Sequence, residues 1–448
     1  MVLVSFLVVV AWVVWAINSP VAALNVLAVF VVISFGFNAI ARLTFTSLSL
    51  FARKRERWPV QAYPAKAAIL VSARNDPSIF QALPSVLRVE NGTIDYKVLV
   101  LDDSTDPDLV ARLVSIPSSL FIQQGPESNL QEISRRINET DHALVVIHRT
   151  NPVGGKAGAI NNAVRILRWS EVDYIALLDA DHHVAPDFLK RGIAASREYG
   201  GPVAGWQPHR LGAYRFLGTF VNVNWAITAM EMQARQRMGL APIFGGSAGI
   251  FPFGWLYDHP FDETSITEDW ELSLQAYLRG EEIPFREDLA AVGIVPANFA
   301  SFRTQQRRWA EGTIRDFRHE FWKILSSRRI NWRTKLGLVY QGLLWTQTLG
   351  LAASIAVVSM GAVFPWFNGA SIPTAVTLGA WGFFTLAHLL PVAVGGKVEG
   401  LRTYRNFRNV VFSLLMLFVM LPDYLYATLR GLFLEKADWV VTKKLGSD

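Results

Sequence analysis

The chain has long apolar runs at its two ends and a mixed pattern of apolar and polar residues between them. Residues 1–17 are almost wholly apolar, Asn18-Ser19-Pro20 interrupts the run, and residues 21–41 are apolar again. Each run approaches the about 20 residues with which a helix spans a bilayer, so the pair predicts a helical hairpin with a short outer turn. A cleavable secretory signal is the competing interpretation of the first run, but that run lacks a basic start and a small-residue cleavage site.

The C-terminal part holds three further apolar stretches. Residues 336–358 and 373–394 predict two more membrane spans. The third stretch, 409–432, contains Pro422, Asp423 and Arg430. Hydropathy alone predicts a span there as well, although a proline and two charges interrupt it.

From Lys66 onward, short aliphatic runs alternate with segments of helical periodicity. Strands are predicted at 67–72, 96–101, 143–148 and 174–178, and helices at 79–87, 107–113 and 157–168. Strands and helices in alternation are typical of a mostly parallel sheet with helices on both faces, so the predicted fold class is α/β. A further helix at 302–326 is rich in basic and aromatic residues, which suits a position at the bilayer surface.

Polar residues follow three of these strands, at the end of a parallel sheet where ligands bind. The three strand ends are SARND at 72–76, Asp102-Asp103-Ser104, and Asp179-Ala180-Asp181. Asp179 and Asp181 are two residues apart on an extended chain, so both can bind one hard cation. Alone, this tripeptide is equally well an acidic turn in which an Asp caps the next helix. Three acidic ends at one edge favour a nucleotide and metal site.

Two histidines, His182 and His183, directly follow the acidic tripeptide. We expect both to be exposed polar residues outside the metal's ligand set, because a hard cation that bridges phosphates prefers oxygen.

Two glycine-rich segments add candidate chemistry. Residues 151–158, NPVGGKAG, bring Lys156 and backbone amides to a helix start, which suits a phosphate, although such a segment is more often only a turn. Residues 243–253 contain Gly246 and Ser247 in an apolar loop, where a polymer or lipid can approach the backbone closely.

Two polar motifs open or occupy predicted helices. Thr267-Glu268-Asp269 begins a helix that runs to Leu278, and its acids predict either a helix N-terminus stabilised by the dipole or a general base. The cluster QQRRW at 305–309 lies on the basic and aromatic helix, whose surface position does not by itself explain so tight a group of Gln, Arg and Trp.

Composition and charge limit the chemistry. The chain of 448 residues has no cysteine, so any metal must be bound by Asp, Glu or His. Hydrophobic residues make up 51% and the mean hydropathy is +0.25, which is high for a soluble protein. The net charge is +6, and lysines and arginines cluster at 42–66 and 397–408, which predicts cytoplasmic segments beside anionic lipid. No segment is typical of a nucleic-acid surface, so no nucleic-acid partner is expected.

The motifs occur in a fixed order between the apolar ends: Asp102-Asp103, Asp179-Ala180-Asp181, Thr267-Glu268-Asp269 and QQRRW at 305–309. In this order of D, DxD, TED and QxxRW, the sequence resembles the membrane-integrated family 2 glycosyltransferases, which include cellulose, hyaluronan, chitin and mannan synthases. The resemblance covers nearly the whole chain. It implies a cytoplasmic GT-A type domain flanked by transmembrane helices and interfacial amphipathic helices.

The resemblance also implies roles for single residues. The residues that would bind the donor are Asp76, Asp102, Asp103, Lys156, Asp179, Asp181, Gln305, Arg308, Thr442 and Lys443. Among them, Asp179 and Asp181 would also bind Mg²⁺ or Mn²⁺ with the diphosphate. Asp269 would be the catalytic base with Glu268 beside it, and the acceptor would contact Trp309, Gly246 and Ser247. Arg307 would help to secure the diphosphate and the acceptor end.

Residues 438–444, DWVVTKK, resemble the gating loop of cellulose synthase and of plant cellulose synthase-like proteins. That loop is cytoplasmic in the family, and five spans would place it outside. We therefore expect four spans, with 409–432 as an interfacial helix broken at Pro422. The expected segments are a hairpin at 1–41, a basic linker at 42–65, the GT-A domain at 66–300, interfacial helices at 301–335, transmembrane and interfacial helices at 336–432, and a gating-loop-like tail at 433–448.

The resemblance implies an inverting transferase that moves a hexose from a UDP- or GDP-hexose to a growing β-glycan, as a processive synthase. The absence of cysteine and the compact chain favour a prokaryotic plasma membrane as its location. One alternative is a transferase that adds one or a few sugars to diacylglycerol or a polyprenyl phosphate. This alternative stays open because processive synthases of the family have more membrane helices after the gating loop than are expected here. For the same reason, a partner subunit or a homo-oligomer is expected to complete a channel. A second alternative, an inactive assembly subunit, is disfavoured because every expected acid is present.

Overall fold

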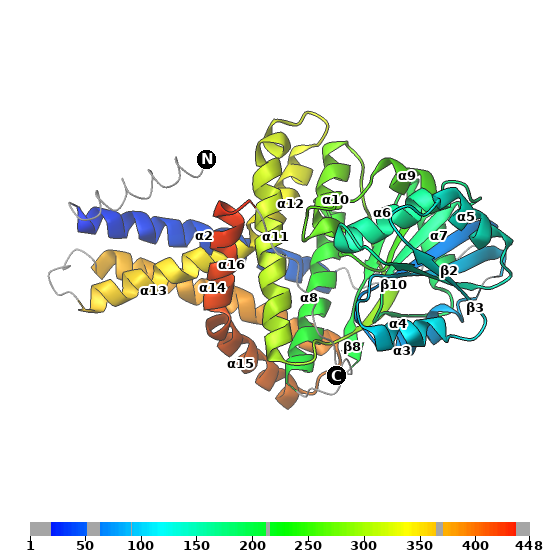
Figure 1. Cartoon of the computed structure of the whole chain (residues 1–448). Coiled ribbons are helices and arrows are strands. Elements are labelled where there is room, and N and C mark those ends of the chain that lie inside the picture. Colours follow the sequence, from blue (N-terminus) through cyan, green and yellow to red (C-terminus); the bar gives the residue numbers. More distant parts are fainter. Residues whose placement is uncertain (1–18, 52–62, 91, 212–215, 364–370, 436–448) are drawn as a thin grey trace.

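The computed structural model describes residues 19–51, 63–90, 92–211, 216–363 and 371–435. Within these residues a sheet domain adjoins a group of long helices, several of which project away from it (Figure 1). The predicted first span at 1–17 and the gating-loop-like residues 438–444, with Thr442 and Lys443, lie outside the described residues.

A 10-stranded sheet forms the centre of the domain, in the order β3-β4-β2-β1-β5-β9-β7-β10-β6 with β8 beside β10. The neighbours from β3 to β5 pair in parallel, whereas β9 runs antiparallel to both β5 and β7. The prediction of a mostly parallel α/β sheet is confirmed. The strands are β1 (Ala65–Ala73), β2 (Ile94–Asp102), β3 (Ser119–Gln124), β4 (Leu144–Arg149), β5 (Tyr174–Asp179), β6 (His183–Val184), β7 (Val203–Trp206), β8 (His209–Leu211), β9 (Gly249–Pro252) and β10 (Phe285–Ile294).

Helices cover both faces of this sheet. One face is packed by α5 (Leu130–Glu139), α6 (Gly155–Leu167), α9 (Phe253–Asp258) and α10 (Glu268–Leu278). The other is packed by α3 (Ile79–Val86), α4 (Pro107–Val114) and α7 (Phe188–Tyr199). Strands β1, β2, β4 and β5 are therefore buried on both faces, which is why they appear in the sequence as aliphatic runs and not as alternating patterns.

Sequence periodicity missed the pair β3 and α5. The edge strand β3 is only partly buried, and α5 is mostly polar, with Ile133 and Ile137 as its buried apolar side chains. Such short, weakly apolar elements do not stand out from loops by pattern alone.

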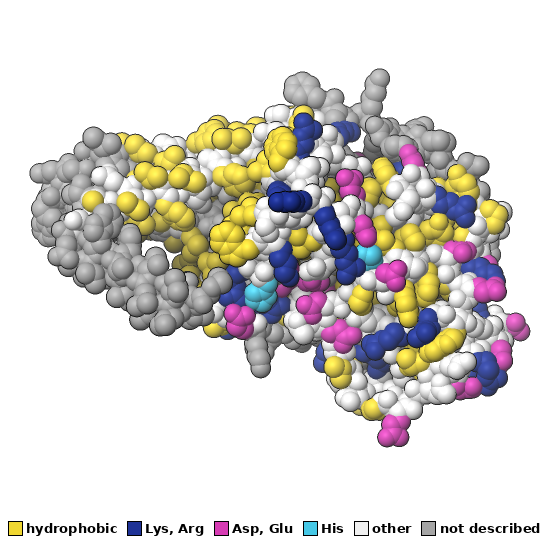
Figure 2. All heavy atoms as spheres, turned by 90° about the horizontal axis from the view of Figure 1, so that it is seen from above, with side chains coloured by type: hydrophobic (Ala, Val, Ile, Leu, Met, Phe, Trp, Pro, Cys, Tyr) yellow, Lys and Arg dark blue, Asp and Glu magenta, His cyan; other side chains and the backbone are white. Residues whose placement is uncertain are grey.

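Three helices project together from the domain: α2 (Pro20–Phe51), α13 (Gln347–Val363) and α14 (Ser371–Val398) (Figure 1). We call them the helical arm. Phe35 of α2 stacks on Phe384 of α14 with ring centroids 4.2 Å apart. Within the described residues, Asn25–Leu50 and Ala375–Val398 are long and apolar enough to cross a membrane. Figure 2 shows apolar side chains along the arm and charged ones mostly over the rest of the molecule, as expected of a membrane protein.

The predicted continuous span at 336–358 is wrong. Its residues belong to α12 (Trp332–Leu343), a 3₁₀ turn (Leu344–Thr346) and α13, and only α13 lies in the arm. Helix α12 packs instead on α11 (Phe299–Ser326), because Gly342 allows the ring of Phe317 to approach its backbone. A hydropathy average over residues 336–358 cannot detect that the chain changes direction within this stretch.

The stretch 409–432 is divided between α15 (Thr403–Val419) and α16 (Leu421–Phe433), which meet at an angle of 51°. Pro422 lies in the first turn of α16, where its missing N–H is tolerated but where it ends the preceding helix. The predicted break is confirmed, and the interfacial position of this segment stays a prediction. The remaining helix, α8 (Leu217–Arg237), lies between the sheet and the arm.

The contact between α12 and α11 can be tested with Gly342→Ala. A Cβ at this position would overlap the Phe317 ring, so we expect a loss of about 1–3 kcal/mol in stability from overpacking. Thermal unfolding of the detergent-solubilised chain measures the effect. Gly382→Ala on α14 is the control, because a Cβ there has no atom within 4 Å and should leave stability equal or slightly higher. Equal stability of the two variants would contradict the described packing.

Candidate active site

A cavity of about 500 Å³ lies at the carboxyl ends of the parallel strands and extends between the helices that adjoin the sheet. The predicted residues that line it are Asp76, Asp103, Lys156, Asp179, Asp181, Gly246, Glu268, Asp269, Gln305, Arg308 and Trp309. These residues come from positions between 76 and 309, so the fold gathers motifs that are far apart in the sequence into one site.

The structure separates the two acids at the end of β2. Asp103 faces the cavity and binds Arg149, whose Nε and Nη2 donate over 2.7 and 2.5 Å. Asp102 is fully buried and does not line the cavity. It accepts hydrogen bonds from Ser104 Oγ at 2.6 Å and pairs with His148 Nδ1 at 2.7 Å. Of these two acids, Asp103 is therefore the one that a ligand in the cavity can contact.

At the end of β1, Asp76 lines the cavity and accepts hydrogen bonds from the backbone N–H and the hydroxyl of Ser78. This contact holds its carboxylate at the start of α3, opposite the end of β5. The acid that the sequence singled out thus lies at the same sheet edge as Asp103 and Asp179.

Asp179, Asp181 and His182 form a group whose potential metal-ligating atoms all lie within 4.8 Å of one another. His182 is only 1% exposed, and its Nδ1 lies 3.4 Å from Asp181 Oδ1. Neither ring nitrogen has a hydrogen-bond partner among the described residues. The expectation that His182 is exposed is wrong, whereas its place outside the metal's ligand set stays a prediction. His183 is partly buried beside it. Two carboxylates and an imidazole fit a divalent cation.

Lys156 neutralises part of this acidic group. Its Nζ donates to Asp179 Oδ1 over 2.6 Å and to the Gly246 carbonyl over 2.7 Å, and lies 3.8 Å from Glu268. Burial acts to raise the pKa of Asp179, but Lys156 and His182 outweigh it and keep that pKa below its ordinary value. The Asp179 carboxylate is therefore ionised at neutral pH.

Gly246 lies between Lys156 and Asp269 with φ at +89°, where L side chains are strained. A Cβ there would be 2.9 Å from Asp269 Oδ2. Its neighbour Ser247 is buried outside the lining, and its hydroxyl accepts the backbone N–H of Asp179 at 3.0 Å. The structure thus places Ser247 as a support for the end of β5.

Asp269 lies in the first turn of α10 and opens onto the cavity. Burial and the neighbouring Glu268 raise the pKa of Asp269 to about 7, although Lys156 opposes the shift. A carboxylate with such a pKa gains and loses a proton near neutral pH, which suits a general base.

Helix α11 presents Gln305, Arg308 and Trp309 to the cavity from one face, as their spacing of three and four residues requires. Arg307 points away from them and forms an ion pair with Asp423 of α16. The structure therefore places Arg307 in a helix contact and not beside the predicted diphosphate site.

Sequence reasoning missed the aromatic residues that face Trp309. Trp225 of α8 meets Trp309 edge to face at 6.0 Å, and its other side stacks on His209 at 4.6 Å. Both Trp225 and His209 line the cavity. Neither lies in a recognisable motif, and only their position in the fold shows that they belong to the site.

Comparison with known proteins was made on this fold and site. The model of glycosyl transferase family group 2 matches residues 174–427. The chain belongs to this family. The predictions of a family 2 glycosyltransferase and of a GT-A type fold are confirmed.

Several curated relatives of this family 2 member are plant proteins. It is 28% identical over 371 residues to "Probable glucomannan 4-beta-mannosyltransferase 9" of Oryza sativa subsp. japonica, covering 78% of this chain and 62% of that relative. It is 26% identical over 411 residues to "Probable glucomannan 4-beta-mannosyltransferase 15" of Arabidopsis thaliana, covering 86% of this chain and 68% of the relative. The chain therefore spans about two thirds of the length of these relatives.

Among solved structures, the chain resembles "Mannosyltransferase PcManGT from Pyrobaculum calidifontis in complex with GDP-Man and Mn2+". The TM-score is 0.57 and the sequence identity 18%, over 92% of this chain and 99% of that one. At this identity the likeness shows a common fold.

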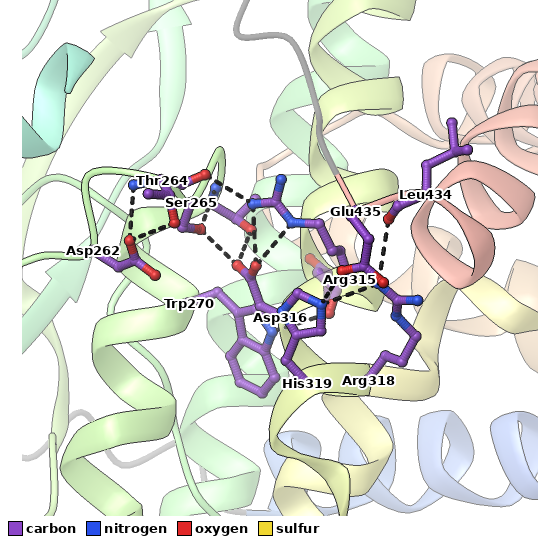
Figure 3. A network of polar contacts seen from close by, with 12 residues as sticks. Asp262, Thr264, Ser265, Trp270, Arg315, Asp316, Arg318, His319, Leu434 and Glu435 are labelled. Atoms are coloured by element: carbon purple, nitrogen blue, oxygen red, sulfur yellow. Dashed lines mark hydrogen bonds and ion pairs between the residues drawn. The ribbon is translucent and has the colours of Figure 1, made fainter. Parts of the chain in front are cut away.

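A polar network fixes the loop before Asp269 to α11 of the transferase (Figure 3). Asp316 of α11 is buried and accepts hydrogen bonds from the hydroxyls of Ser265 and Thr267 at 2.7 and 2.8 Å. Arg315 donates to the Thr264 carbonyl over 3.2 Å. Through these contacts the helix that presents Trp309 also fixes the start of α10.

The same helix contacts the end of α16. Arg318 donates to the Leu434 carbonyl, and both Arg318 and His319 pair with Glu435 at 3.2 and 3.1 Å (Figure 3). Glu435 is exposed, so these pairs contribute little stability, but they define where the chain leaves α16.

We expect Asp316→Ala to lower the free energy of unfolding by about 1–3 kcal/mol, because it leaves two buried hydroxyls without their acceptor. Thermal or denaturant unfolding checks this change. Asp262→Ala, in the same loop, is the matched control, since exposed Asp262 binds only Thr264 of its own turn. If both variants lost the same stability, the network would not have the described role.

Proposed function

We propose that this chain transfers a hexose with inversion from a nucleoside diphosphate sugar to the hydroxyl of a growing β-glycan, and that it does so processively. One observation carries the proposal: a single cavity joins an acidic group for the diphosphate, a carboxylate with a pKa near neutrality, and an aromatic platform for a sugar. The names of the plant relatives support mannose as the transferred sugar and a β-1,4-glycan as the product.

On the donor side, Asp76 and Asp103 would contact the nucleoside, while Asp179, Asp181 and His182 would hold a divalent cation, Mg²⁺ or Mn²⁺. Such a cation would neutralise charge on the diphosphate leaving group. Lys156 and Arg308 would add positive charge to the same group, since both line the cavity next to these acids. Gln305 would donate a hydrogen bond to it.

On the acceptor side, the terminal sugar would stack on Trp309 and Trp225, whose rings meet at the cavity wall. Its hydroxyl would then face Asp269, which removes the proton as the new glycosidic bond forms. Burial, with a further contribution from the adjacent Glu268, raises the pKa of Asp269 for this role. Gly246 leaves the space that this approach requires.

Product analysis tests the proposal. The purified chain is incubated with labelled GDP-mannose, UDP-glucose and related donors, with and without Mg²⁺ or Mn²⁺. Polymer from one donor supports processive synthesis, while chloroform-extractable label supports the alternative of a few transfers to a lipid. Absence of transfer from every donor would contradict both.

Several further predictions are part of the proposal. Membrane lipids, and a partner subunit or homo-oligomer that completes a channel, remain expected partners. A prokaryotic plasma membrane remains the predicted location, although the plant relatives lend it no support. Thr442 and Lys443 would close over the donor. Both lie outside the residues that the structure describes.

Asp269→Asn should reduce transfer at least about 100-fold, because an amide cannot accept the acceptor's proton. Donor affinity, measured by equilibrium binding of the nucleotide sugar, should stay within about twofold of wild type, since the metal-side residues are unchanged. Glu271→Gln on the same helix is the control and should keep activity, because Glu271 does not line the cavity. Turnover near the wild-type level in Asp269→Asn would exclude this residue as the base.

The pH profile reports on the same carboxyl group. Because the base acts only when deprotonated, kcat/KM should rise through pH of about 7 and level off above it. Lys156 lowers the pKa of Asp269, so Lys156→Met should move the midpoint to higher pH while also reducing the rate. A midpoint that stays in place or moves to lower pH would contradict the assignment.

A further inference from the structure

The cavity does not end at the acceptor platform. Beyond Trp225 and Trp309 its walls come from the helices of the arm and from α8 and α12. At this end it is lined by polar side chains, namely Arg42 of α2, Glu231 of α8, Gln341 of α12, Gln347 of α13 and His388 of α14. We call this group the membrane-end site.

Both candidate membrane spans contribute an ionisable residue to the membrane-end site. Arg42 is the sole charged residue of Asn25–Leu50, and His388 lies well inside Ala375–Val398. The stacked rings of Phe35 and Phe384 align the two helices, with His388 one turn and Arg42 two turns further along. Ionisable side chains are costly within a bilayer and are retained there where they bind something.

Several hydrogen-bonding atoms of the membrane-end site have no partner among the described residues. Among the described residues, Arg42 Nε is buried without a hydrogen-bond partner, and the Arg42 charge interacts with Glu231, which lines the same end of the cavity. His388 Nδ1 is buried without a partner as well. The Gln341 carbonyl oxygen accepts from Arg235 at 2.7 Å, which leaves its amide N–H groups for a ligand. Gln347 Oε1, an acceptor, is also buried without a partner, so the described part of this lining holds both donors and an acceptor that are available to a ligand.

Glu231 is the acid at this end of the cavity. Burial raises the pKa of Glu231 and favours its neutral, proton-donating form. Arg235, one turn later, donates to the carbonyls of Ala241 and Gly337 and so does not fill the cavity. Arg42 opposes this rise in the pKa of Glu231, so the two side chains lie close enough to interact at this end of the cavity.

We propose that the membrane-end site binds the phosphate of a membrane lipid that carries the acceptor saccharide. This inference rests on the proposed function and names the carrier of its acceptor. A neutral glycan would offer the buried Arg42 Nε–H and the amides only uncharged acceptors, whereas a phosphate offers acceptor oxygens that carry charge and match the guanidinium. The saccharide would extend from this phosphate along Trp225 and Trp309 to Asp269.

The lipid part has a place as well. Apolar side chains of α2 and α14 are exposed on the outside of the arm, among them Ile33, Ile40 and Leu386, so a lipid tail can lie against them. This position favours a lipid phosphate over a free phosphate ion, because the site lies where the spans meet the cavity and not at the open sheet edge.

Binding of a defined probe to the full chain, in an uncharged polyoxyethylene detergent, tests the inference. The probes are a hexose linked to farnesyl phosphate through a phosphodiester, the neutral farnesyl hexoside, and inorganic phosphate. We expect wild type to bind the phosphodiester at least about tenfold more tightly than the neutral hexoside, as for a hydrogen-bonded charge pair. Arg42→Gln should abolish this difference, and Arg42→Lys should restore part of it.

Lys397→Gln is the control, because it removes a positive charge from α14, the helix that carries His388, at an exposed position outside the cavity. It should bind all probes like wild type. His388→Gln is a second variant with a smaller expected loss for the phosphodiester, and it serves if Arg42→Gln does not fold. Equal affinity of wild type for the charged and neutral lipids would overturn the inference, and so would competition by inorganic phosphate at the affinity of the lipid.

Binding and transfer separate the two proposals. Tight, Arg42-dependent binding of the phosphodiester without sugar transfer from any donor would overturn the proposed function and support the lipid site. Transfer to a glycan acceptor, without preferential binding of the charged lipid, would support the proposed function and overturn the lipid site.

Discussion

The ion pair between Lys156 and Asp179 is the interaction on which the site depends. Four carboxylates, Asp179, Asp181, Glu268 and Asp269, lie around one buried space, and their mutual repulsion would force some of them to bind protons. Lys156 reaches two of them and also the carbonyl of Gly246, so one ammonium joins α6, β5 and the loop before β9. It keeps the pKa of Asp179 below its ordinary value, while burial and the neighbouring Glu268 raise the pKa of Asp269 although Lys156 opposes that shift. The two acids thus differ in pKa because Lys156 outweighs burial at Asp179 and does not at Asp269.

Helix α11 connects this chemistry to the membrane helices. Its cavity face holds Gln305, Arg308 and Trp309, while Arg303 and Arg307 on another face bind the buried Asp423 of α16. Glu311 binds Arg430 of α16 at 2.9 Å, and Asp316 holds the loop before α10. Asp423 is buried while its arginine partners are partly exposed, so these pairs add little net stability but penalise any arrangement that leaves the buried carboxylate unpaired. They therefore define the position of α11 relative to both the sheet and the apolar helices.

Prediction from sequence succeeded where local pattern and tertiary role coincide. Strands β1, β2, β4 and β5 lie in the buried centre of a parallel sheet, so their aliphatic runs are both the local signal and the cause of their burial. The strand ends after them carry Asp76, Asp103 and Asp179, and a parallel sheet necessarily brings such ends to one edge. Prediction failed at α12, where a glycine and a neighbouring phenylalanine turned an apolar stretch away from the arm, and at His182, where burial depends on pairing between β6 and β10.

The sequence by itself determined the fold class, the order of the motifs and the presence of apolar helices, because these follow from periodicity and from residues adjacent in the chain. Only the tertiary structure decided which acid after β2 meets the cavity, that Arg307 serves a helix contact, and that Trp225 and His209 belong to the site. It alone brought Arg42 and His388 to the far end of the same cavity. The physical reason is that these properties depend on burial, charge and free space contributed by segments far apart in the sequence, and no local pattern records them.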